Sequence, residues 1–122
     1  MSVDLSTPVL VVHDYPTMGS IVTNVLKQIG FAHVDGVGDG PRALRKLRGK
    51  NYGLVISDDA MAPMSGEELL RAMRAEPAMA TTPFLLLTTP HKAGHTSLRA
   101  DIVAKPFNAR TLHSKIVTLL QQ

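Results

Sequence analysis

The chain has 122 residues, of which 44% are hydrophobic and 19% charged, and it contains no cysteine. This length suits one globular domain, and the missing cysteine excludes disulfides, thiolate metal sites and a cysteine nucleophile. No apolar run approaches the roughly 18 residues that span a bilayer, and the first residues lack the pattern of a signal peptide. We therefore expect a cytoplasmic protein that does not insert into membranes.

The net charge of +3 is modest, but basic residues concentrate between positions 42 and 50. Between them lie Ala43, Leu44 and Leu47 at helical spacing, which is typical of an amphipathic helix with its charged face in solvent. The stretch has no aromatic residue for base stacking, so we predict no nucleic-acid partner. The basic residues are Arg42, Arg45, Lys46, Arg48 and Lys50.

The first predicted elements are a strand, a helix and a second strand. Residues 9–12 are β-branched or leucine and predict a buried strand. Pro16 suits the first turn of a helix, apolar residues recur at helical spacing after it, and Gly30 is placed as its stop. Residues 32–37 form the next strand candidate, before a glycine-rich turn and the basic helix.

The central predicted strand leads into two carboxylates and a helix start. Residues 54–56 form an apolar run of the kind found in buried parallel strands, and Asp58 follows at its carboxyl end. Ser65 with Glu68 three positions later is a capping-box pattern, which predicts a helix that ends by Pro77.

The last part of the chain predicts two strands and a helix. Residues 83–88 form an apolar strand that ends in hydroxyl-bearing side chains, and residues 102–104 form a brief strand before a proline turn. Positions 91–100 are polar and offer a short helix at most. Asn108 is placed as the cap of the final helix.

Alternating strands and helices with short connections imply βαβ units and a parallel sheet covered on both faces. Five strands and about five helices fit the length. We predict the doubly wound, flavodoxin-like strand order 2-1-3-4-5, which brings the ends of the first and third strands together. This order places Asp14 beside Asp58.

In that arrangement four strand-end groups converge on one edge: the carboxylates of Asp14 and Asp58, the Thr88 hydroxyl and the Lys105 ammonium. Clustered carboxylates repel one another, and a hard divalent cation such as Mg²⁺ relieves that repulsion. A carboxylate at such a site can attack a phosphodonor and form an acyl phosphate, whose charge the cation and the lysine would neutralise.

Four segments together resemble the receiver domain of two-component response regulators, and the similarity covers nearly the whole chain. It is closest to the single-domain chemotaxis regulators, whose amino-acid sequences are also similar over residues 16–31, 52–58 and 68–75. The four segments are Val11-Val12-His13-Asp14, Val55-Ile56-Ser57-Asp58, Leu86-Leu87-Thr88 and Lys105-Pro106-Phe107.

The resemblance implies roles for particular residues. Asp58 would be the phosphoacceptor, and Mg²⁺ would be bound by Asp14, Asp58 and the backbone carbonyl of Ala60. Thr88 would be the switch hydroxyl, and Lys105 would pair with the phosphoryl group.

The resemblance also implies a biological role. We expect residues 1–122 to be a single receiver domain without an output domain, monomeric, and a switch rather than an enzyme that turns over a substrate. A histidine kinase would phosphorylate it, and a downstream protein such as the flagellar motor switch would bind it, in chemotaxis.

Several residues depart from the family pattern. His13 replaces an acid, which predicts weaker Mg²⁺ binding and makes the imidazole an additional candidate ligand. Asp59, after the acceptor, is expected to point to solvent. The segment between Thr88 and Lys105 is about five residues shorter than in chemotaxis regulators, and Ile102 stands where an aromatic switch residue is common.

Two alternatives remain open. His13, Ile102 and the short segment also fit a receiver fold that binds partners without being phosphorylated. A small hydrolase with a carboxylate nucleophile is the other, and the lack of an acid two residues after Asp58 counts against it.

Overall fold

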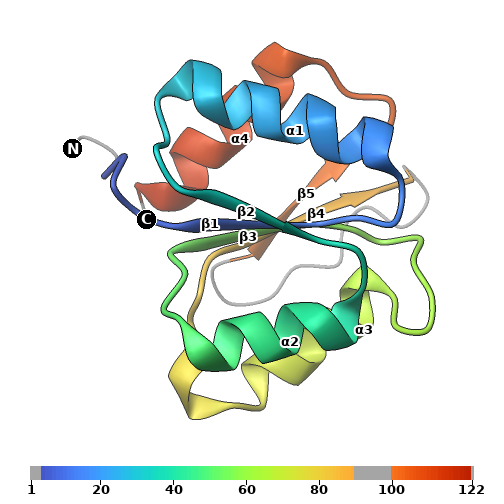
Figure 1. Cartoon of the computed structure of the whole chain (residues 1–122). Coiled ribbons are helices and arrows are strands. Elements are labelled where there is room, and N and C mark those ends of the chain that lie inside the picture. Colours follow the sequence, from blue (N-terminus) through green and yellow to red (C-terminus); the bar gives the residue numbers. More distant parts are fainter. Residues whose placement is uncertain (1–3, 90–99, 122) are drawn as a thin grey trace.

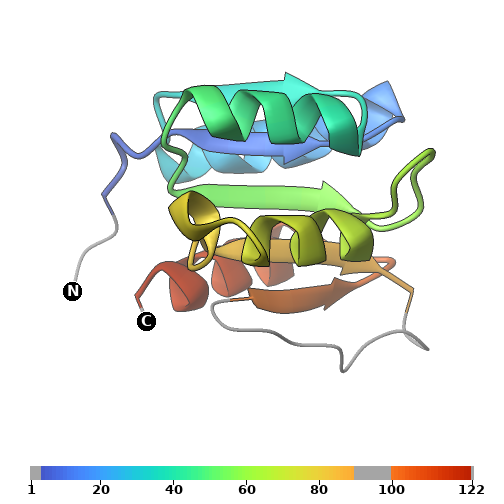
Figure 2. The ribbon, with the colours of Figure 1, turned by 90° about the horizontal axis from the view of Figure 1, so that it is seen from below.

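The computed structural model describes residues 4–89 and 100–121, which contain five parallel strands in one sheet. The strand order is β2-β1-β3-β4-β5, as predicted. All arrowheads point to the same end of the sheet in Figure 2, so the carboxyl ends of the strands share one edge. The strands are β1 (Val9–Val12), β2 (Val34–Val37), β3 (Leu54–Asp58), β4 (Phe84–Thr88) and β5 (Ala100–Ala104).

Four α-helices of the described residues cover the two faces of the sheet (Figure 1). Helices α1 (Pro16–Ile29) and α4 (Ala109–Leu120) lie on one face, and α2 (Gly40–Gly49) and α3 (Gly66–Arg74) on the other. A short 3-10 helix, Pro77–Met79, follows α3. No helix in the described part of the chain has both the length and the apolar character needed to cross a bilayer.

Side chains of the strands alternate between two apolar clusters, because successive residues of a strand point to opposite faces. Val11, Ile56 and Val103 pack on the side of α1 and α4. Val12 and Leu86 pack on the side of α2 and α3. A residue at the carboxyl end of a strand therefore faces the same side of the sheet as the residue two positions before it. We call this alternation the parity of the residue.

Strand ends differ from prediction at the two edges of the sheet. β2 begins at Val34 rather than at residue 32, because its pairing starts opposite Val9, the first residue of β1. β5 begins at Ala100, two residues earlier than predicted, because its backbone pairs with β4 from Phe84 onward. The expected short helix at 91–100 falls, except for Ala100, outside the described residues.

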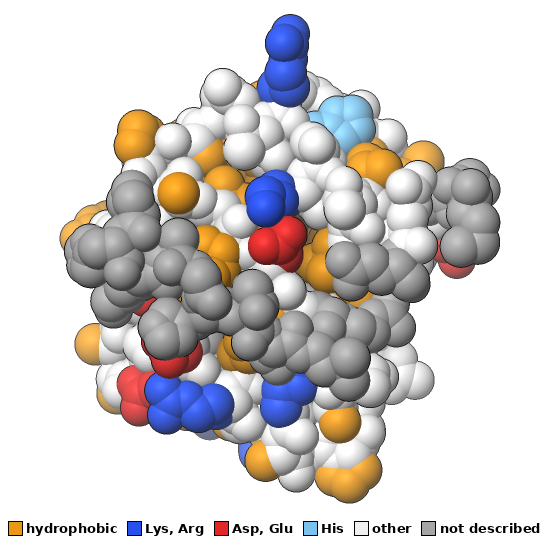
Figure 3. All heavy atoms as spheres, turned by 180° about the vertical axis from the view of Figure 1, so that it is seen from behind, with side chains coloured by type: hydrophobic (Ala, Val, Ile, Leu, Met, Phe, Trp, Pro, Cys, Tyr) orange, Lys and Arg blue, Asp and Glu red, His pale blue; other side chains and the backbone are white. Residues whose placement is uncertain are grey.

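Acidic partners neutralise much of the basic stretch around α2. Arg42, Arg48 and Lys50 each form an ion pair with an acidic side chain at 3.0–3.4 Å, while the apolar side of α2 is buried. On the face shown in Figure 3, basic and acidic side chains of the described residues adjoin at the centre and at the lower left, a basic side chain stands apart at the top, and hydrophobic ones form separate spots. The prediction of a solvated helix face is confirmed. The acids are Asp39, Glu76 and Asp35.

Tyr52 anchors the edge strand β2 through Asp35. Its buried hydroxyl donates to Asp35 Oδ2 at 2.5 Å, and Lys50 Nζ lies 3.2 Å from the same oxygen. These contacts, the Tyr52 hydroxyl foremost, lower the pKa of Asp35 below its ordinary value of 3.8. Burial, followed by the bond to Asp35, raises the pKa of Tyr52.

We expect Tyr52→Phe to lower the free energy of unfolding by about 1 kcal/mol at pH 7, because it removes a hydrogen bond to a carboxylate that solvent partly screens. A lowered folded-state pKa means that the contribution is present above the unfolded pKa of Asp35 and is lost as the pH falls through the folded value. The deficit of the variant should therefore shrink at pH 3. Urea unfolding at both pH values measures it, with Tyr15→Phe, at an exposed tyrosine, as the control. An equal deficit at both pH values would contradict this account.

Candidate functional site

Asp58 and Lys105 meet at the carboxyl edge of the sheet. Asp58 ends β3 on the side of Ile56, and Lys105 follows β5 on the side of Val103, so parity aims both at the face of α1 and α4. Lys105 Nζ pairs with Asp58 Oδ1. The Asp58 side chain is only 3% exposed and that of Lys105 is 25% exposed, which makes this a largely desolvated ion pair at the rim of the sheet.

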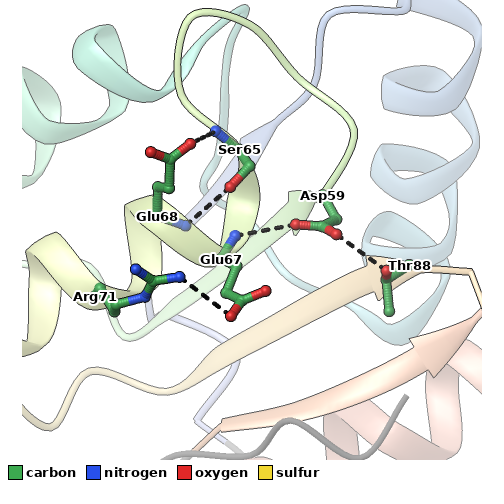
Figure 4. Close-up of polar contacts among 6 residues, drawn as sticks. All are labelled: Asp59, Ser65, Glu67, Glu68, Arg71 and Thr88. Atoms are coloured by element: carbon green, nitrogen blue, oxygen red, sulfur yellow. Dashed lines mark hydrogen bonds and ion pairs between the residues drawn. The ribbon is translucent and has the colours of Figure 1, made fainter. Parts of the chain in front are cut away.

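Asp59 is buried, and the expectation that it points to solvent is wrong. It is 4% exposed, because the ladder continues past the last strand residue: its N–H donates to Leu87 O at 3.0 Å. Its parity is opposite to that of Asp58, so its carboxylate faces α3. Figure 4 shows its two oxygens accepting from the backbone N–H of Glu67 at 3.1 Å and from the Thr88 hydroxyl at 3.1 Å.

A capping box and a glycine fix the start of α3 close to Asp59. Ser65 Oγ accepts from Glu68 N and the Glu68 carboxylate accepts from Ser65 N, which confirms the predicted capping box (Figure 4). The Ser65 backbone N–H is the main cause of a lowered pKa of Glu68. Gly66 follows the cap, and a Cβ there would lie 2.6 Å from Leu86 Cδ1 and 3.0 Å from Asp59 Cα. Only glycine allows this approach of helix and strand.

The His13 ring packs against helix α1, and among the described residues no hydrogen bond or ion pair joins it to Asp58. His13 shares the parity of Val11, and its ring lies against Gly19 in the first half of α1, where a Cβ at Gly19 would be 2.5 Å from the imidazole Cδ2. Within the described part of the chain, its buried Nδ1 has no hydrogen-bond partner. Asp14, the next residue, is exposed. The structure thus brings together Asp58 with Lys105 and Asp59 with Thr88, but not His13 with either pair.

The donor set at this edge fits a hard cation that keeps several waters. Asp58 is the last residue of β3, and Asp14 lies two residues after the end of the adjacent strand β1, where Val12 pairs with Ser57. Among the described residues no hydrogen bond reaches Asp58 Oδ2, and these residues hold no cluster of three His, Asp or Glu side chains suited to a metal. Two carboxylates and a backbone carbonyl, such as that of Ala60, are the few oxygen ligands that Mg²⁺ takes beside water and phosphate.

A family model described as the response regulator receiver domain matches residues 9–117. The chain belongs to this family. The receiver domain is 33% identical over 119 residues to the chemotaxis protein CheY of Pseudomonas aeruginosa, with 93% of this chain and 96% of that protein aligned. Its family is one of signalling proteins, and the resemblance seen in the sequence is confirmed.

Solved structures share the fold of this receiver domain. The chemotaxis response regulator CheY4 of Vibrio cholerae has a TM-score of 0.82 at 29% identity, covering 93% of this chain and 98% of that one. The receiver domain of the sensor histidine kinase PA1611 of Pseudomonas aeruginosa, solved with a magnesium ion coordinated in its active-site cleft, has a TM-score of 0.84 at 22% identity, covering 96% and 99%. The second likeness concerns the fold alone.

Asp59 is the residue whose contacts the sequence did not predict. The signal was present in the strand period, since Asp59 continues the α3-facing parity of Val55 just as Thr88 continues that of Leu86. Ile102, where an aromatic residue is common in the family, has the same parity and is buried at 7% exposure in the cluster with α2 and α3.

Proposed function

We propose that this receiver domain accepts a phosphoryl group from a histidine kinase on Asp58, with Mg²⁺, and signals by binding a protein partner while it is phosphorylated. The observation that carries the proposal is the ion pair between buried Asp58 and Lys105 at the carboxyl edge of a parallel sheet. Ligands of such sheets bind at this edge, where loops converge on a rigid framework.

The chemistry assigned to the pair is a phosphoryl transfer. Asp58 Oδ2, on the side of the carboxylate away from Lys105, attacks the phosphorus of a phosphohistidine. A P–O bond forms and the P–N bond breaks, with its electron pair left on the ring nitrogen. The other ring nitrogen of the phosphohistidine carries a proton taken from water, so the histidine leaves as a neutral imidazole. Lys105, already beside Asp58, shifts its ammonium to an oxygen of the transferred group and offsets its charge.

Asp14, Asp58 and the carbonyl of Ala60 are the proposed Mg²⁺ ligands, and the cation supplies neutralisation of charge on the phosphoryl oxygens. The set contains one acid fewer than the family pattern because position 13 is a histidine, and its ring lies against α1. We expect the affinity for Mg²⁺ to be correspondingly low.

The relatives named for chemotaxis support the same biological setting here. The proposed partner is a flagellar motor switch protein or the kinase itself.

The test is the intact mass of the protein after incubation with Mg²⁺ and acetyl phosphate, a small phosphodonor. We expect a Mg²⁺-dependent gain of one phosphoryl group, no gain in Asp58→Ala, and a normal gain in Asp101→Asn. Asp101 is a matched control because it also pairs with a lysine, Lys115, but lies outside the site. Retention of the full gain in Asp58→Ala would reject Asp58 as the acceptor.

The second candidate is a receiver fold that binds partners without phosphorylation. The presence of His13 in place of an acid favours it, because it removes one anionic ligand from the proposed metal site. No mass gain in the wild-type protein, together with no Mg²⁺ binding by titration calorimetry, would reject the first candidate and favour this one.

A further inference from the structure

Asp59 joins the start of α3 to the last residue of β4. One carboxylate oxygen accepts the Glu67 backbone N–H at 3.1 Å, and the other accepts the Thr88 hydroxyl at 3.1 Å (Figure 4). Asp59 and Thr88 are 4% and 2% exposed, so this bond is made in the interior. Thr88 is also close to the acceptor, since Asp58 pairs across the ladder with Leu87, the residue before it.

We propose that Asp59 is a positioning residue that controls the Thr88 hydroxyl and thereby sets the affinity of the Asp58 site for a phosphoryl group. The proposal rests on the proposed function of Asp58. A hydroxyl has a single proton to donate, and in this structure that proton points to the Asp59 carboxylate. Thr88 can donate to a group on Asp58 only by giving up this bond.

Before phosphorylation, the Thr88 hydroxyl donates its proton to the Asp59 carboxylate. A hydrogen bond from a hydroxyl to an ionised carboxylate is stronger than one between neutral groups, and at buried atoms water does not readily replace it. A phosphoryl group on Asp58 must therefore compete for the Thr88 proton against a carboxylate acceptor that the fold holds in place.

The Asp59 carboxylate also links the state of the Thr88 hydroxyl to helix α3. Its other oxygen caps the Glu67 N–H in the first helical turn, where negative charge is favourable. If Thr88 leaves Asp59, the carboxylate loses one of the contacts that orient it, and the hydrogen bond to Glu67 changes with it. The first turn of α3 thus senses the state of Asp58 through Asp59.

Asp59→Asn reverses the direction of the bond without changing the shape of the side chain. The amide oxygen can still accept from Glu67 N, while its NH₂ group faces Thr88 and donates to the hydroxyl. The Thr88 proton is then available to a group on Asp58. We expect the variant to bind beryllium fluoride, which occupies a carboxylate oxygen as a phosphoryl group does, about fivefold more tightly in the presence of Mg²⁺.

A double-mutant cycle separates this effect from the loss of a negative charge. T88V keeps the volume of the side chain and removes the hydroxyl, so D59N in the T88V background should tighten beryllium fluoride binding by less than twofold. T88S, which restores the hydroxyl, should recover the larger effect. E67Q is the charge control, because the Glu67 side chain pairs with Arg71 and not with Thr88. It should change the affinity by less than twofold.

NMR provides a readout other than affinity. Beryllium fluoride should shift the Glu67 amide resonance of the wild-type protein, and this shift should be smaller in D59N. Equal tightening by D59N with and without T88V, or no tightening at all, would overturn the role of Asp59. Failure of the wild-type protein and all variants to bind beryllium fluoride would instead reject the proposed function of Asp58, and this inference with it.

Discussion

Gly66→Ala is expected to destabilise the protein by about 3 kcal/mol, at the upper end of the range for overpacking. The new methyl group would overlap the carbonyl oxygen of Asp58 and lie 3.0 Å from Asp59 Cα, and these are backbone atoms of a central strand that cannot move aside cheaply. Alanine's better helix propensity, about 1 kcal/mol at most, does not offset such a clash.

Urea unfolding at pH 7 measures the effect, and Gly49→Ala is the matched control. Gly49 is also a helix-terminal glycine, but nothing lies within 4 Å of where its Cβ would be, so alanine there should be neutral or slightly stabilising. Similar stabilities of the two variants would show that α3 does not approach β3 as closely as described. Phosphoryl uptake by Gly66→Ala should also fall, because the displaced strand carries the acceptor.

Lys105→Met is expected to lower the free energy of unfolding by about 2 kcal/mol. It leaves the carboxylate of Asp58, which is 3% exposed, without the cation that pairs with it. Removing one partner of a fully buried pair costs about 3–5 kcal/mol, and we reduce that figure because Lys105 is a quarter exposed and water can enter at the rim.

The cause of this loss can be checked by adding Asp58→Asn. In the Lys105→Met background it removes the unpaired charge, so the double variant should regain at least half of the lost stability. Lys115→Met is the control, because the pair of Lys115 with Asp101 is more exposed and should contribute less than about 1 kcal/mol. Equal losses in Lys105→Met and Lys115→Met would mean that Asp58 is solvated.

Much of the fold could be predicted because it follows from local patterns. Apolar runs such as residues 54–56 mark buried strands, and the Ser65 capping box and the Gly30 stop mark helix ends. The strand order followed from the alternation of strands and helices and from the short connections between them. The ends of β2 and β5 could not be predicted as well, because pairing with neighbouring strands decides them.

The candidate site was predicted as one converging group, and the structure resolves it into two pairs. Asp58 pairs with Lys105, and Asp59 pairs with Thr88. The prediction that Asp59 points to solvent is wrong because its N–H still belongs to the β3–β4 ladder and not to a loop. The prediction of His13 as a ligand rests on the chemistry of imidazole, and the structure places its ring against α1.

The contact of His13 with Gly19 constrains the order in which this protein can change by mutation. Any side chain at position 19 must share space with the imidazole ring, since even a Cβ would overlap it. A larger residue at Gly19 therefore requires the imidazole ring to move from its place against α1, and a smaller side chain at position 13 would remove that requirement. The two positions should consequently vary together among close homologues.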